Sequence, residues 1–145
     1  MTSVLRWAGE MRINDPGTLS NALQRLRGDT SYVRLSHRLS RETDGRLDLD
    51  PTGLQRLVTG QFTTLRAVDS PTEAFIFGLG MMLNGLAEEQ DAQRVLRDGK
   101  LILVQLLGMP WAELAFAEIE LRARQISHVA SLREFLKECM TRWLA

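Results

Sequence analysis

The most apolar stretch of the chain covers residues 74–86 and reads AFIFGLGMMLNGL. Its large apolar side chains fall on every side of a helix, whereas a helix at a protein surface keeps one polar side. Ser70, Pro71 and Glu73 precede the stretch as a helix-start signal, with a capping hydroxyl, a proline at the first helical position and a carboxylate that completes a capping box. The pattern therefore predicts a buried central helix over residues 71–87.

Glycines within this predicted helix require an explanation, because each costs about 0.5–1 kcal/mol relative to alanine in a helix interior. Gly78 and Gly85 are seven residues apart and so share a face, where a neighbouring helix can approach closely. That neighbour could belong to the same chain, which makes the contact core packing, or to a second copy, which makes it a dimer interface. A ligand slot is a further alternative.

Helical periodicity continues on both sides of the central stretch. The four prolines, at positions 16, 51, 71 and 110, mark expected helix boundaries. On the N-terminal side we expect a short helix over 3–12, one over 19–26 that stops at Gly28, one after a cap at Asp29 or Thr30, and one over 54–68 with a break near Gly60. The alternation of Leu47 and Leu49 with charged residues indicates at most one very short extended segment, near 46–49.

On the C-terminal side we expect a helix that ends at Gly108 and, after Pro110, two helices with a joint near 127–131, where Ser131 could serve as a cap. The chain is therefore predicted to be all-α, a compact bundle of roughly six to eight helices around the central one. We expect a single domain over 1–145, with an Arg-rich part over about 1–69 and an apolar part over about 70–145.

Composition narrows the function classes. The 145 residues include eighteen basic and eighteen acidic ones, so no overall field favours nucleic acid or an anionic membrane. The apolar stretch is shorter than the roughly 17–25 residues of a membrane-crossing helix. The single cysteine excludes an internal disulfide, and with two histidines it makes a His/Cys zinc site improbable. The N-terminal residues lack a signal-peptide pattern, so we expect a cytoplasmic protein.

Catalytic constellations are missing from the sequence. Cys139 lies on an apolar helical stripe, which indicates a structural thiol. The aspartates before Gly53 do not fit a calcium loop, because Thr59 stands where a bidentate glutamate is required. The glycines of GLGMMLNG lack the lysine of a phosphate-binding loop. We therefore expect no enzyme, no metal and no cofactor.

The strongest local signal is a run of basic residues. Arg34, His37, Arg38 and Arg41 are spaced to lie along one side of a single helix, with Arg46 shortly after it. If this helix is the second of a helix-turn-helix, the five residues form a nucleic-acid surface. His37 alone could also serve as the phosphate acceptor of a phosphotransfer module, although Arg38 stands where an acidic neighbour is usual.

We expect a non-enzymatic protein that binds another protein chain through helix–helix interfaces, as a regulator, adaptor or assembly subunit, and that self-associates as a homodimer. Aromatic residues near the ends of helical segments are expected to anchor such interfaces. The candidate interface residues are Trp7, Gly78, Gly85, Trp111 and Trp143. The alternative is a DNA-binding transcriptional regulator that uses the Arg-rich helix and dimerises through its C-terminal part.

Overall fold

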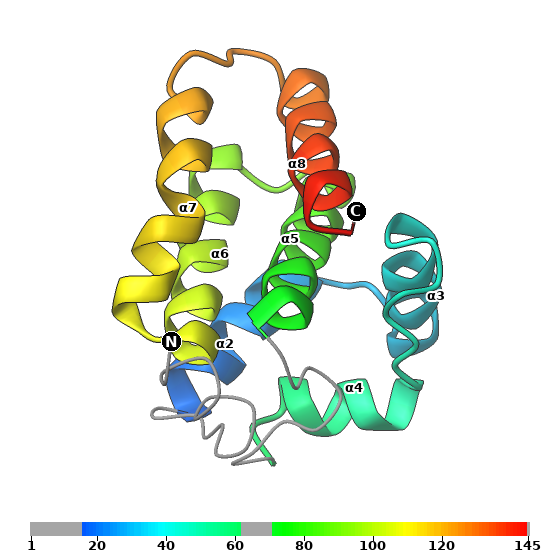
Figure 1. Ribbon diagram of the computed structural model, residues 1–145. Coiled ribbons are helices and arrows are strands. Elements are labelled where there is room, and N and C mark those ends of the chain that lie inside the picture. Colours follow the sequence, from blue (N-terminus) through cyan, green and yellow to red (C-terminus); the bar gives the residue numbers. More distant parts are fainter. Residues whose placement is uncertain (1–15, 62–70, 145) are drawn as a thin grey trace.

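The computed structural model describes residues 16–61 and 71–144. These residues form seven helices and no strand, which confirms the predicted all-α fold (Figure 1). The helices are α2 (Pro16–Arg27), α3 (Tyr32–Glu42), α4 (Pro51–Val58), α5 (Pro71–Ala87), α6 (Ala92–Leu107), α7 (Met109–Ala123) and α8 (Val129–Leu144). The helix expected over 3–12 lies outside the described residues.

Helix α5 is the buried centre of the fold, as predicted. All of its residues from Ala74 to Leu86 are buried. It packs against α2, α3, α6 and α8, and Figure 1 shows it between α3 on one side and the α6 and α7 pair on the other. The helix begins at Pro71, whereas Ser70 and the expected capping hydroxyl lie outside the described residues.

The glycines of α5 make room for other helices of the same chain. A Cβ atom at Gly78 would lie 2.7 Å from Leu103 Cδ2 on α6. A Cβ atom at Gly85 would lie 3.0 Å from side-chain atoms of both Leu26 on α2 and Val95 on α6. Of the alternatives left open by the sequence, these contacts correspond to packing within one core.

Helix ends in the first half follow local sequence signals, with one correction. Gly28 adopts φ 58° after α2, and Gly60 adopts φ 76° after α4, which confirms the stop at the former and the break near the latter. The cap of α3 is Ser31, whose side chain accepts a hydrogen bond from the Arg34 amide. The expected cap at Asp29 or Thr30 was therefore wrong, and Thr30 is buried in a different role.

The second half contains the two predicted helices after Pro110. The first turn of α8 includes a hydrogen bond from the Leu132 amide to the His128 carbonyl, 3.1 Å long. Helix α8 therefore begins before Ser131, which lies inside its first turn and is not its cap. Residues 46–50 form neither helix nor strand, and Leu47 among them is buried in the core.

Candidate functional site

The predicted basic surface on α3 is only partly exposed. Arg34, His37 and Arg41 are exposed, whereas Arg38 turns inward and its side chain is 14% exposed. The Arg38 guanidinium donates a hydrogen bond from Nη1 to Asn84 Oδ1 of α5, 2.5 Å away. The placement of Arg38 with the other three on one accessible face is therefore corrected, because α5 offers it a buried acceptor.

Asn84 is the polar centre that draws Arg38 inward. Its Nδ2 donates to the carbonyl of Leu26, 2.9 Å away, in the last turn of α2. The last carbonyls of a helix have no partner within that helix, so a buried helix end needs such a donor. Thr30 Oγ1 donates to Glu88, whose carboxylate also lies 4.0 Å from Arg38. In the sequence, the sign of this role was Asn84 itself, a polar residue inside the apolar stretch 74–86.

The remaining basic residue of the predicted surface, Arg46, is bound to an acidic partner. Arg46 Nε lies 2.7 Å from Glu73 Oε1 at the start of α5. On α3 itself, Glu42 lies 3.2 Å from Lys137 of α8. Of the five residues, only Arg34, His37 and Arg41 are therefore exposed for a nucleic-acid contact.

The predicted interface residues are distributed unevenly. Gly78 and Gly85 are buried within the chain, so neither is accessible to a second copy in this conformation. Trp111 is half-buried at the start of α7 and packs against the core. Trp7 and the side chain of Trp143 lie outside the described part of the chain.

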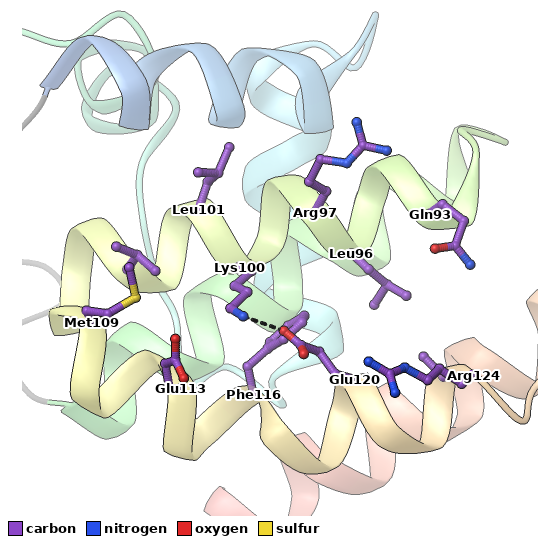
Figure 2. Close-up of a pocket in the computed structure, with 12 residues that line it drawn as sticks. Gln93, Leu96, Arg97, Lys100, Leu101, Met109, Glu113, Phe116, Glu120 and Arg124 are labelled. Atoms are coloured by element: carbon purple, nitrogen blue, oxygen red, sulfur yellow. Dashed lines mark ion pairs between the residues drawn. The ribbon is translucent and has the colours of Figure 1, made fainter.

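Sequence reasoning missed an open groove between α6 and α7. Its volume is about 580 Å³. The two helices run in opposite directions, joined only by Gly108. Figure 2 shows the side chains along the groove, with Lys100 and Glu120 between the helices and Leu101 and Arg97 on the side of α6 turned away from α7. The groove is lined by Gln93, Leu96, Arg97, Lys100, Leu101, Val104, Met109, Glu113, Phe116, Glu120, Ala123 and Arg124.

Charges on this groove are ordered from one end to the other. Lys100 Nζ and Glu120 Oε1 bridge its middle at 2.6 Å, and the hydrogen bond to Glu120 raises the pKa of Lys100 above its usual value. Arg97 and Arg124 lie toward one end, and Glu113 lies toward the other, beside Met109 (Figure 2). Among the described residues, Arg97, Arg124 and Glu113 form no ion pair.

Helix α7 also exposes apolar side chains on its outer face. Leu114 is 75% exposed and Leu121 is 59% exposed, with exposed Ala117 between them on the same side of the helix. The opposite side buries Ala112, Phe116 and Ile119. Leu114 and Leu121 lie outside that buried stripe in the sequence, and this could have predicted the exposed apolar face.

A second cavity, of about 340 Å³, contains Cys139 but offers no catalytic partner for it. Its other lining residues are Phe75, Ala115, Glu118, Ile119 and Arg142. Burial raises the pKa of the Cys139 thiol, which disfavours the thiolate needed for nucleophilic attack. The residues that the structure describes contain no cluster of three or more His, Cys, Asp or Glu side chains suited to a metal ion.

Fold and site define this chain as an all-helical protein with an apolar groove. Comparisons with models of protein families, with curated proteins and with solved structures find no match. Of the helices described, none combines the length and the hydropathy needed to cross a membrane.

Proposed function

We propose that this protein binds another protein chain, whose apolar helical face enters the groove between α6 and α7. The observation that carries this proposal is the groove itself, which has a mostly apolar lining, a rim with charged residues and the Lys100–Glu120 pair across its middle. A helix in a groove is a recurrent mode of recognition, because the apolar side of an amphipathic helix needs a matching concave surface.

Dimensions of the groove suit such a partner. Along α6 it extends from Gln93 to Val104, which is roughly 16 Å at the rise of an α-helix. That length accommodates about three turns of a bound helix. Leu96, Leu101 and Val104 are half-buried along it, so a partner can remove further apolar area from water at about 25 cal/mol per Å².

The charged rim favours a partner with acidic side chains at one end. Arg97 and Arg124 lie without ionic partners in the described residues, so carboxylates placed above them gain charge-assisted hydrogen bonds. The Lys100–Glu120 pair is already satisfied and contributes little preference. Charge at the rim should therefore set the orientation of the bound helix more than its affinity.

The nucleic-acid alternative has less support. It retains Arg34, His37 and Arg41 as exposed groups, but Arg38 serves the interior and Arg46 binds Glu73. Absence of a global positive charge also leaves little attraction to phosphates. The proposed role is therefore that of a non-enzymatic regulator, adaptor or assembly subunit in the cytoplasm.

Photo-crosslinking from the groove tests the proposal. A photoreactive amino acid at Leu101 or Val104, introduced in cells that naturally make the protein, should give one or more discrete adducts with another protein. The matched control places the same group at Val33, an exposed apolar residue on α3, 53% exposed. Adducts from Val33 alone, or none from the groove, would contradict the proposal.

A further inference from the structure

The outer face of α7 is a second apolar surface, separate from the apolar lining of the groove. We propose that two copies of this chain pair through this face, with their α7 helices side by side in opposite directions. The outer face consists of Leu114, Ala117 and Leu121. The apolar line lies on a side of α7 other than the groove wall, and only Glu113 and Arg124, at its edge, also line the groove. The pairing does not depend on the function proposed for the groove.

Spacing along α7 suits an antiparallel pair. Leu114, Ala117 and Leu121 follow one another at intervals of three and four residues, which places them in one line on the helix. In a two-fold antiparallel arrangement centred near Ala117, Leu114 of one copy lies opposite Leu121 of the other, twice over. The small side chain at the centre lets the helix axes approach closely.

Charges on one flank of this line select the antiparallel direction. Glu113 and Arg124 lie on that flank, eleven residues or roughly 16 Å apart, and neither forms an ion pair among the described residues. The charge of Glu113 also acts on Lys100, whose pKa it helps to raise. Antiparallel pairing brings Glu113 of each copy toward Arg124 of the other. In a two-fold parallel pair, the same flank of the two helices falls on opposite sides of the interface, so Glu113 and Arg124 would not meet across it and this attraction would be lost.

The opposite flank is already neutralised by contacts within the chain. Glu118 lies 3.3 Å from Arg142 of α8. The guanidinium of Arg122 lies 4.9 Å from the ring centroid of Phe135, also on α8. These residues therefore neither demand a partner nor repel the second copy strongly, and the surface is charge-complementary to itself.

The first experiment is sedimentation velocity of the full chain from roughly 1 to 200 μM, a range suited to a small interface. A concentration-dependent dimer is expected, and Leu121→Asp should abolish it by placing a carboxylate in the apolar line. Val33→Asp is the matched control, because it makes the same change at an exposed apolar site on α3, and it should leave the dimer intact. Circular dichroism confirms that both variants remain folded.

Charge reversal then tests the direction of pairing. Glu113→Arg alone, or Arg124→Glu alone, should raise the dimer dissociation constant about tenfold at low salt, because each change turns both intermolecular pairs into like-charge contacts. Mixing the two variants should restore dimers, since every pair between the two different chains is then attractive. The double variant Glu113→Arg with Arg124→Glu should dimerise like the original chain.

Several outcomes would overturn this proposal: a monomer at all concentrations, a dimer that survives Leu121→Asp, or two charge variants that stay apart when mixed. Failure here is distinguishable from failure of the proposed function. Groove adducts at Leu101 with a protein other than this chain can occur in a monomer, and an α7 dimer can form without them.

Discussion

At the scale of single residues, the backbone conformation of Gly108 allows the chain to turn from α6 directly into α7. Its φ of 85° and ψ of 157° belong to a region that essentially only glycine occupies. Gly108→Ala should lower the free energy of unfolding by about 1–3 kcal/mol through backbone strain. Urea denaturation measures this loss.

Gly53→Ala is the control, because this glycine lies inside α4 without a positive φ and a Cβ there would meet Asp50 Oδ1 at an ordinary 3.4 Å. Helix propensity alone predicts a gain of up to about 1 kcal/mol. Equal losses for both substitutions would contradict the strain argument.

The two neighbouring arginines of α3 should differ in their contribution to stability. Arg38→Ala removes a donor to buried Asn84 and should cost about 1–3 kcal/mol. Exposed Arg34 has no such contact, so Arg34→Ala should change stability by no more than about 0.5 kcal/mol. Thermal denaturation of the two variants measures the difference, and similar effects would argue against an internal role for Arg38.

Cys139 should be a poorly reactive thiol. Burial raises its pKa, so the thiolate population at mildly alkaline pH is smaller than for an exposed cysteine. Because the folded pKa exceeds the unfolded one, the associated stability is present below the unfolded pKa and is lost as pH rises through the folded pKa. Iodoacetamide labelling against pH should rise later than for the unfolded chain, and superimposed curves would contradict this.

At the scale of elements, the α5–α6 contact depends on a matched pair of residues. Gly78→Ala places a Cβ 2.7 Å from Leu103 Cδ2, and the overpacking should cost about 1–3 kcal/mol, of which the better helix propensity of alanine offsets up to about 1 kcal/mol. Leu103→Ala removes a buried side chain and should cost about 2–5 kcal/mol.

The double variant should cost less than the sum, since each change relieves the other. A double-mutant cycle from urea denaturation measures this coupling. Additive costs would show that the helices adjust independently at this contact.

At the scale of the whole molecule, α5 should be the last element to open. It is buried along nearly its whole length and contacts α2, α3, α6 and α8, whereas α4 packs mainly on α2 and α3. Hydrogen exchange should therefore be slowest in α5 and faster in α4. Exchange in α5 as fast as in α4 would contradict a central role for α5.

The sequence determined most of the helical framework, because caps, stop glycines and apolar periodicity act over a few residues. Three helix boundaries in the structure lie where the sequence predicted them, at Gly28, Pro71 and Gly108. The cap of α3 was predicted one or two positions too early, because Asp29, Thr30 and Ser31 are consecutive residues of types that can all cap a helix.

Only the tertiary structure decided which helices face one another, and with them the candidate surfaces. Arg38 turns inward because α5 places Asn84 beside it, a contact between residues far apart in the chain. The groove exists because α6 and α7 lie together, and Leu114 is exposed because no described helix covers it. Periodicity identifies the side of a helix that is buried, but the partner on that side depends on long-range packing that no local pattern encodes.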